Sequence, residues 1–244
     1  MRGILSILVL LTFLYNGQAI ASTAKPVSIT AKSWLVADGK GKIIDGENTK
    51  QQRSIASITK LITAMVVLDA KQNLDEYIKP YTRRELLQLS IVHSDNNATN
   101  LLCDHYPGGR SSCVHALNAK AHFLNLPNTR FTEPTGLSVF NVSTAEELVK
   151  MVITASTYPE IVLASKTSAV KIKIKKKWLI FRNTNPIIGQ RHDFIVSKTG
   201  YIRASGGCIV MMLNTDVGQR IVVVLGSKNT HTRIPEAEFI AHQK

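Results

Sequence analysis

Apolar and polar residues alternate near residue 35, and a nearly continuous apolar run follows from residue 57. Residues 33–38 (SWLVAD) alternate as a β-strand does, and the turn at 39–42 leads into Ile43 and Ile44, which predicts a β-hairpin. Residues 57–71 are apolar on nearly every side, a pattern typical of a helix buried in a domain core. The pattern therefore predicts a hairpin followed by a central helix.

The middle of the chain carries helix start signals. Thr82 and Glu85 form a capping-box pattern ahead of a helix expected over 83–93. Ser143 and Glu146 form a second such pattern, ahead of a helix that should end near residue 156. Two further helices are predicted over 97–106 and 112–126, the latter capped by Ser112.

The last third returns to a period of two and to β-branched residues. Residues 170–175 (VKIKIK) alternate strictly, and a closing helix with an early proline is expected over 235–243. Further strands are predicted over 194–196, 208–213 and 221–225. Strands near both ends of the chain predict one antiparallel sheet. A helical subdomain (about 72–160) is expected between its two parts, giving an α+β domain with α/β/α layers.

The first 21 residues have the pattern of a secretory signal peptide. Arg2 precedes an apolar run over 4–14, and Ala19-Ile20-Ala21 fits a small-x-small cleavage site. An uncleaved anchor is the alternative, although the run is shorter than the ~20 residues that a membrane span needs. We therefore expect a periplasmic or secreted protein whose mature domain covers residues 22–244.

The chain is strongly basic, with 30 Lys and Arg against 17 Asp and Glu and a net charge of +13. Export makes nucleic acid a poor partner, so peripheral association with an anionic envelope surface is the better expectation. Lysines at 171–177 alternate with apolar residues, which predicts an edge strand protected by outward charge. Attraction of these lysines to anionic wall polymer is the functional alternative.

Three cysteines bear on the redox compartment. Cys103 and Cys113 flank a turn-rich insert, and a disulfide between them would stabilise an exported fold by about 2–3 kcal/mol. Zinc binding by Cys103-x-His105 and Cys113-x-His115 is the alternative, but residues two apart on a helix point to different faces. We expect no metal, and Cys208 is predicted to be a core residue of a buried strand.

The chemistry-bearing candidates begin with Ser57 and Lys60, three residues apart at the start of the buried helix. At this spacing the two side chains share one face, and the serine lies where backbone N–H groups are free. A neutral Lys60 could take the proton of Ser57 as its oxygen attacks a carbonyl. Desolvation and a second cation would lower the pKa of Lys60 toward neutrality.

Two further triplets follow in order: Ser-Asp-Asn at 94–96, at a helix end, and Lys-Thr-Gly at 198–200, at a strand end. Together with Ser-x-x-Lys they form the serine-acylating set of penicillin-binding proteins and class A β-lactamases. Ser94 can relay a proton to a leaving amine, and Asn96 can hold a substrate amide and orient Lys60.

The Lys-Thr-Gly strand supplies the remaining candidate substrate-binding groups. Lys198 is expected to tune Lys60 and attract a substrate carboxylate, to which Thr199 also offers a hydroxyl. Gly200 would let substrate backbone approach the strand. The amide of Tyr201 would complete an oxyanion hole with that of Ser57.

The sequence resembles the low-molecular-mass penicillin-binding proteins of the serine D-Ala-D-Ala carboxypeptidase/endopeptidase family, and within it the D-alanyl-D-alanine endopeptidase branch. The resemblance implies a β-lactamase/DD-peptidase-like transpeptidase fold, acylation of Ser57 by peptidoglycan stem peptides, and covalent inhibition by β-lactams, without metal or cofactor. It implies cleavage of the D-Ala to diaminopimelate crosslink, with D-Ala-D-Ala carboxypeptidase activity as the alternative. The stretches that carry it include ASITKLITAMVVLDA, HSDNNATNLL, FRNTNPIIG and VSKTGYIRASGGCIVM.

Two features leave less probable alternatives open. The segment 71–93 is about twenty residues shorter than is usual in the family, and we expect it near the cleft rim, where it would affect substrate choice and would fit a non-catalytic penicillin- or peptidoglycan-binding module. Glu133, in FTEPTGLS, is a candidate deacylation residue of a β-lactamase. The rest of that loop does not match, so a structural turn at Glu133 is the preferred interpretation.

Overall fold

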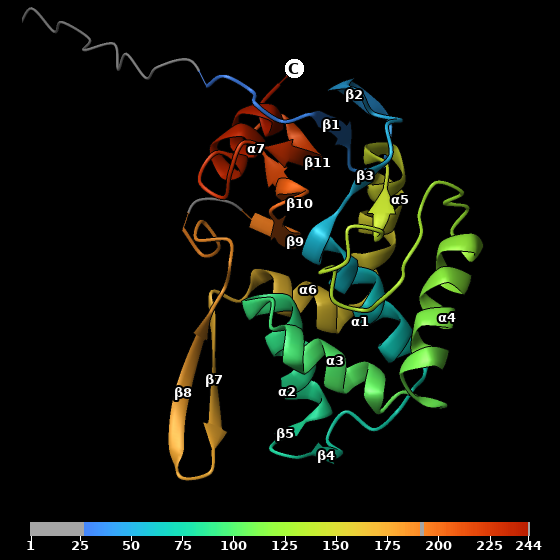
Figure 1. Cartoon of the computed structure of the whole chain (residues 1–244). Coiled ribbons are helices and arrows are strands. Elements are labelled where there is room, and N and C mark those ends of the chain that lie inside the picture. Colours follow the sequence, from blue (N-terminus) through green and yellow to red (C-terminus); the bar gives the residue numbers. More distant parts are fainter. Residues whose placement is uncertain (1–26, 191–192, 244) are drawn as a thin grey trace, which may run out of the picture.

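A five-stranded antiparallel sheet forms the centre of the computed structural model, which describes residues 27–190 and 193–243 (Figure 1). The predicted signal peptide lies outside these residues. The strand order is β2-β1-β11-β10-β9, so the N-terminal hairpin joins the C-terminal strands through β1 and β11. The strands are β1 (Ser33–Asp38), β2 (Ile43–Glu47), β9 (Asp193–Ile202), β10 (Gly206–Thr215) and β11 (Gly218–Ser227).

The two faces of the sheet pack in separate apolar cores. Alternate residues of a strand point to opposite faces, and on β11 Val223 lies in the core shared with the helical part while Val224 faces α7 (Arg233–Ala241). The buried thiol of Cys208 lies in the first core, as expected. Helix α7, the sheet and the remaining helices form three layers, which confirms the α+β fold with α/β/α layers (Figure 1).

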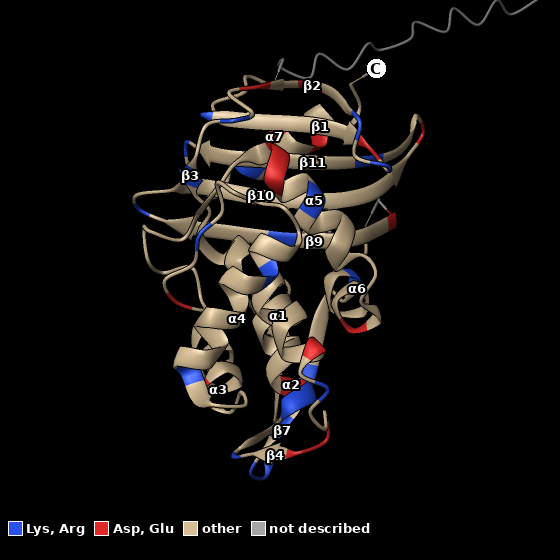
Figure 2. Cartoon of the chain, turned by 90° about the vertical axis from the view of Figure 1, so that its right-hand side faces the viewer, with Lys and Arg blue, Asp and Glu red and all other residues tan. Residues whose placement is uncertain are grey.

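The helical part is built around α1, whose residues Thr59 to Val67 are all buried. This confirms the helix predicted from a continuous apolar pattern. Figure 2 shows α1 extending away from the sheet among the other helices. The helical elements are the 3₁₀ turn η1 (Ala56–Ile58), α1 (Thr59–Asp69), α2 (Arg83–Gln88), the π-helical turn η2 (Leu89–His93), α3 (Asn96–Asp104), α4 (Gly109–Phe123), α5 (Ala145–Ala155) and α6 (Pro159–Lys166).

The predicted helix starts are partly right. Thr82 and Glu85 form the expected capping box of α2. The second predicted box is wrong by one residue, because the side chain of Thr144 accepts the hydrogen bond from the backbone N–H of Glu147 at 3.2 Å. Helix α4 begins at glycine residues that make the preceding turn, so Ser112 lies inside that helix and does not cap it.

Strands β7 (Ala169–Ile174) and β8 (Lys177–Arg182) form a two-stranded ribbon separate from the main sheet, and Figure 1 shows it as an orange hairpin extending from the body. The strand at 170–175 was predicted. Its partner β8 was missed because the run Trp178-Leu179-Ile180 shows no alternation, and α6 was missed as well. The lysine-bearing strand therefore protects the edge of this ribbon and not that of the central sheet.

The shortened segment between α1 and α2 lies far from the sheet. It contains the small hairpin β4 (Tyr77–Ile78) and β5 (Tyr81–Thr82), which Figure 1 places at the end of the molecule opposite the sheet. Helix α1 has 11 residues at 1.5 Å each, so about 16 Å separate its N-terminal end, next to Ser57, from its C-terminal end, where this segment begins. The expectation that residues 71–93 border the cleft is therefore wrong for the part up to α2. Only the last turn of the segment, η2 (Leu89–His93), leads directly into Ser94. The remaining short strands, β3 (Arg53–Ser54) and β6 (Val142–Ser143), pair with each other.

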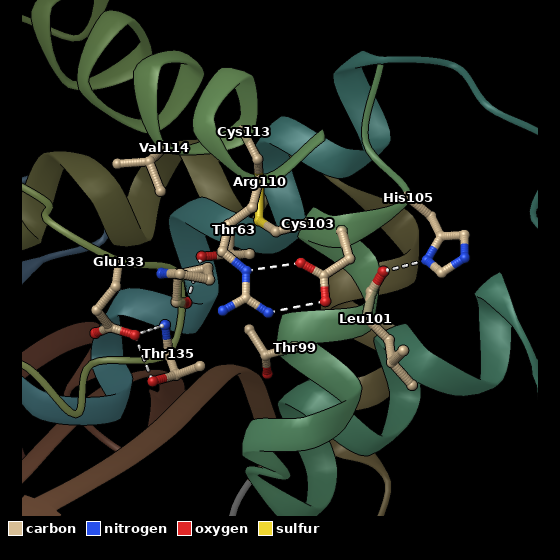
Figure 3. The surroundings of a disulfide bond; sticks show 12 residues. Thr63, Thr99, Leu101, Cys103, His105, Arg110, Cys113, Val114, Glu133 and Thr135 are labelled. Carbon is tan, nitrogen blue, oxygen red and sulfur yellow. Dashed lines mark hydrogen bonds and ion pairs between the residues drawn. A yellow bond between two sulfur atoms is a disulfide. The ribbon is translucent and has the colours of Figure 1, made fainter. Parts of the chain in front are cut away.

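A disulfide links the end of α3 to α4. Cys103 and Cys113 are both buried and their Cα atoms lie 5.4 Å apart (Figure 3). Both cysteines of the alternative zinc site are therefore bonded to each other, and neither thiol is left to bind zinc. The described residues also contain no cluster of three His, Cys, Asp or Glu side chains that could hold a metal.

Candidate active site

The start of α1, the loop after η2 and the edge strand β9 meet around one pocket of about 240 Å³. The short turn η1, which carries Ser57, packs against β9, where Gly200 lies beside Ala56 and the backbone of Ser57. Most of the site residues predicted from the sequence line this pocket: Ser57, Ser94, Asn96, Thr199, Gly200 and Tyr201. The other two, Lys60 and Lys198, are buried and reach the lining residues through hydrogen bonds.

Lys60 has three polar neighbours. Its Nζ lies 2.8 Å from Ser57 Oγ, 2.8 Å from Asn96 Oδ1 and 2.7 Å from the carbonyl oxygen of Thr135. The two carbonyl-type oxygens can only accept, whereas the hydroxyl can donate or accept. A neutral amine fits this set with two N–H donors and one lone pair, and an ammonium fits it with three donors. A proton can thus pass from Ser57 to Lys60 without rearrangement.

The environment of Lys60 favours the neutral amine. Burial lowers the pKa of Lys60 from 10.5 to about 7, against the opposing effects of the Glu133 and Asp95 carboxylates. A base with this pKa is half deprotonated near neutral pH and still basic enough to accept a proton. The sequence predicted the direction of this pKa change and desolvation as one cause. The second cation that it also expected, Lys198, is not among the causes of the change at Lys60.

Lys198 occupies a second buried position beside the first. Its Nζ donates to Ser94 Oγ at 2.8 Å and to the carbonyl oxygen of Thr199 at 3.0 Å. Burial, followed by repulsion from Lys60 and Arg233, lowers the pKa of Lys198 well below its usual value. Ser94 holds its hydroxyl toward Lys198 from a left-handed conformation (φ 59°) that ends η2.

The turn that carries Ser57 is held by close backbone packing. Ala56 has a positive φ of 46°, a conformation that costs about 1 kcal/mol or more outside glycine. A Cβ at Gly200 would lie 2.9 Å from the Ser57 nitrogen, and one at Gly136 would overlap the carbonyl oxygen of Ala56. Both glycines therefore let β9 and the 133–138 turn press against the nucleophile's backbone. The packing of Gly200 against the Ser57 backbone is a second role, besides the substrate approach that the sequence predicted.

Glu133 belongs to the structural turn that the sequence favoured. Its carboxylate accepts hydrogen bonds from the backbone N–H groups of Thr135 and Gly136 at 2.7 and 2.6 Å, and from Asn141 Nδ2 at 3.0 Å. Figure 3 shows the Glu133 carboxylate turned toward Thr135. The turn in this way fixes the Thr135 carbonyl oxygen that accepts from Lys60.

Sequence analysis missed the groups that complete the pocket at its other end. Arg233, the first residue of α7, is 7% exposed, and its Nη1 donates to the carbonyl oxygen of Gly200 at 2.7 Å. Thr184 Oγ1 accepts a hydrogen bond from Thr199 Oγ1 at 2.6 Å, and Thr230 also lines the pocket. Thr184 lies in the stretch FRNTNPIIG, which carries the family resemblance, but no role was predicted for it, and Thr230 and Arg233 belong to no local motif. An arginine among the apolar positions of 233–241 was the one available signal.

The fold and the pocket are typical of one class of enzymes, in which the substrate acylates a serine beside a buried lysine within an α/β/α domain. The D-alanyl-D-alanine carboxypeptidase family model (peptidase S11) matches residues 20–78 and 74–229. The chain belongs to this family of serine peptidases. The break between the two matched segments falls in the shortened connection between α1 and α2.

Individual relatives agree with this assignment. The chain is 36% identical to the D-alanyl-D-alanine endopeptidase of Escherichia coli, over 94% of this chain and 84% of the relative. It is 34% identical to the D-alanyl-D-alanine endopeptidase of Pseudomonas aeruginosa, over 96% and 86% of the two chains.

Solved structures share the fold. A Streptomyces DD-transpeptidase superimposes with a TM-score of 0.80 at 25% identity, over 87% of this chain and 96% of that one. The cefotaxime-bound penicillin-binding protein D2 of Listeria monocytogenes gives a TM-score of 0.78 at 23% identity, over 87% and 96% of the chains. The second similarity bears on the fold alone.

Proposed function

We propose that this chain is a serine-type D-alanyl-D-alanine endopeptidase that hydrolyses peptidoglycan crosslinks through an acyl-enzyme on Ser57. The observation that carries the proposal is the 2.8 Å contact between Ser57 Oγ and a lysine amine whose pKa is about 7. The names of the E. coli and P. aeruginosa relatives support the substrate class.

Acylation follows from the hydrogen bonds around Lys60. Ser57 Oγ attacks the carbonyl carbon of the D-Ala residue while its proton passes to Lys60 Nζ. The C–N bond then breaks, and the leaving amine takes a proton relayed by the Ser94 hydroxyl, which Lys198 orients. Water later attacks the ester and transfers a proton through Lys60, and Ser57 regains its hydroxyl.

Substrate binding uses the free edge of the sheet. Strand β9 is the last strand in the sheet, so an extended peptide can add beside it. The backbone amides of Ser57 and Tyr201 would receive the oxyanion, which in such sites contributes several kcal/mol. Thr199, Lys198 and Arg233 gather hydroxyl and cationic groups where a substrate carboxylate would bind.

Three alternatives are weighed by particular observations. A D-Ala-D-Ala carboxypeptidase would use the same groups, and the family description supports it. A β-lactamase needs a carboxylate that drives deacylation, and the Glu133 carboxylate is instead engaged by the backbone of its own turn. A non-catalytic binding module would have no use for a buried amine placed against the nucleophile.

The experiment compares the mature wild-type protein with Ser57→Ala on purified crosslinked muropeptides, with products identified by mass. Release of monomers by wild type alone supports the endopeptidase. Loss of a single alanine from monomeric pentapeptides, with dimers left intact, would assign a carboxypeptidase instead. Labelled penicillin should attach to wild type and not to Ser57→Ala. Absence of any covalent product in the wild type would refute the proposal.

We also propose that the protein is exported to the periplasm or secreted and associates peripherally with anionic envelope surfaces. The signal pattern of residues 1–21 and the net charge of +13 support this location. No helix in the described ranges is long and apolar enough to cross a membrane. Fractionation of cells that express the full chain tests the location, and recovery in the cytoplasm would contradict it.

A further inference from the structure

A second cavity of about 460 Å³ adjoins the candidate active site beyond β9. It lies between the 184–188 turn and the start of α7, and it shares Thr184, Thr230 and Arg233 with the pocket that contains Ser57. The two spaces therefore adjoin at these three side chains. The mechanism above uses no other residue of this cavity.

The cavity combines apolar walls with a polar boundary. Ile187 and Ile234 contribute to it. Ile234 belongs to the apolar core around α7 and Ile187 packs against that core, so both positions are fixed by packing. Pro186 and Pro235 add rigid apolar surface on either side. Glu238 also lines the cavity and adds a carboxyl group to it. Such a lining suits an aliphatic segment that carries polar groups at its ends.

Internal hydrogen bonds hold the two walls in place. Asn185 Nδ2 donates to Ser197 Oγ at 3.0 Å, which ties the 184–188 turn to β9. On the other wall, Asn229 Oδ1 accepts from the backbone N–H groups of His231 and Thr232 at 2.8 and 3.1 Å. The cavity is thus preformed, which reduces the entropy cost of filling it.

Arg233 marks the boundary between the two spaces and has unused hydrogen-bonding capacity. Its Nη1 donates to Gly200 O, but its Nε is buried without a hydrogen-bond partner among the described residues. The Nε atom itself is enclosed, but a guanidinium has five N–H donors, so Arg233, which lines both spaces, keeps donors for an incoming acceptor. An anionic group bound here would lie between the pocket and the cavity.

The position of the cavity relative to the scissile bond follows from the Lys-Thr-Gly strand. Lys198, Thr199 and Arg233 would bind the carboxylate on the leaving-group side, and the cavity continues outward from these residues. A peptide that ends in D-Ala ends at this carboxylate. A crosslinked peptide continues past it, because its leaving amine belongs to a second stem peptide.

We propose that this cavity is the subsite for the leaving half of a crosslinked substrate, an aliphatic, carboxylate-bearing amino acid joined to further peptide. The inference rests on the proposed function and extends it. Ile187 and Ile234 would contact the aliphatic part, and Arg233 the carboxylate. The subsite would distinguish crosslinked peptides from monomeric ones, which leave the cavity empty.

The test fills the cavity with bulky side chains. Ile187→Trp changes a half-buried wall, and His231→Trp changes an exposed residue at the rim, where misfolding is less of a risk. Leu163→Trp, on exposed α6 surface outside both spaces, is the matched control. The readout is the ratio of kcat/KM for crosslinked dimer to that for monomeric pentapeptide, with penicillin acylation as the measure of folding.

We expect the ratio to fall at least tenfold in Ile187→Trp and His231→Trp, mainly through a higher KM for the dimer, and to stay unchanged in Leu163→Trp. An unchanged ratio in both cavity variants, with a wild type that cleaves dimers, refutes the subsite and leaves the proposed function standing. A wild type that acylates with penicillin but cleaves no dimer overturns both. If Ile187→Trp loses acylation through misfolding, His231→Trp alone decides.

Discussion

Lysines occupy two regions of this molecule in opposite environments. In the cleft, Lys60 and Lys198 are at most 1% exposed and each contacts a serine hydroxyl. On the β7–β8 ribbon, Lys171 and Lys173 are exposed and lie over the ring of Trp178 at 5.1 and 5.9 Å. The same type of side chain is therefore shielded from water in one region and carries a hydrated surface charge in the other.

The difference arises from desolvation. Removing water from an ammonium group disfavours its charged form, and the nearby carboxylates of Glu133 and Asp95 only partly offset this at Lys60. The ribbon keeps water around its lysine heads while their stems cover the Trp178 ring. Burial, and not residue type, separates the candidate catalytic lysines from the others.

The largest loss of acylation rate is expected when Lys60, the hydrogen-bond partner of Ser57, is replaced. Lys60→Met should lower the rate of penicillin acylation by about 10³-fold, because a positioned general base contributes about 10²–10⁴. Lys173→Met, on the ribbon, is the matched control and should keep the rate within about twofold. Stopped-flow acylation with a fluorescent penicillin measures both rates. Equal loss in the two variants would mean that the cleft environment is not decisive.

The second effect is on pH dependence. With a pKa of about 7, only about 1% of Lys60 is neutral at pH 5, so acylation should fall about 100-fold from its plateau above pH 8. A flat profile between pH 5 and 8 would show that Lys60 is not the titrating base. The unfolded chain keeps this proton up to about pH 10.5. Lys60 therefore makes the folded state more stable as pH rises from 7 to 10.5.

A smaller loss is expected at the second buried lysine. Lys198→Met removes the donor to Ser94 Oγ and a candidate carboxylate partner, but it leaves the contact between Ser57 and Lys60 intact. Loss of one charge-assisted hydrogen bond corresponds to roughly tenfold in kcat/KM. The rate of hydrolysis of a D-Ala-D-Ala peptide gives kcat/KM. A loss as large as that of Lys60→Met would contradict the proposal that Lys60 is the base and Lys198 a supporting group.

The smallest catalytic effect is expected on the ribbon. The double variant Lys171→Gln/Lys173→Gln should acylate at the wild-type rate. Its binding to vesicles that contain anionic lipid should weaken by about fivefold per lysine at low salt. The difference should disappear at high salt, where exposed charges are screened. Sedimentation of the vesicles measures binding, and identical binding of both proteins at low salt would remove the ribbon from the proposed envelope association.

Local patterns in the sequence were sufficient to predict several features of the structure. The buried helix α1 follows from a continuous apolar run, and the capping box at Thr82 places the start of α2. The positions of Ser57 and Lys60 on one helix face follow from their spacing alone. These features depend on neighbours in the chain, so the sequence determines them without knowledge of the fold.

Other features needed the tertiary structure, because they depend on groups far apart in the chain. Arg233 meets Gly200 only because α7 packs on the outer face of the sheet, and Thr135 O reaches Lys60 only through the turn held by Glu133. The cavity beyond β9 likewise exists only between α7 and the 184–188 turn. The sequence determined which side chains could do the chemistry. Long-range packing decided how deeply they are buried, and burial sets their pKa and their partners.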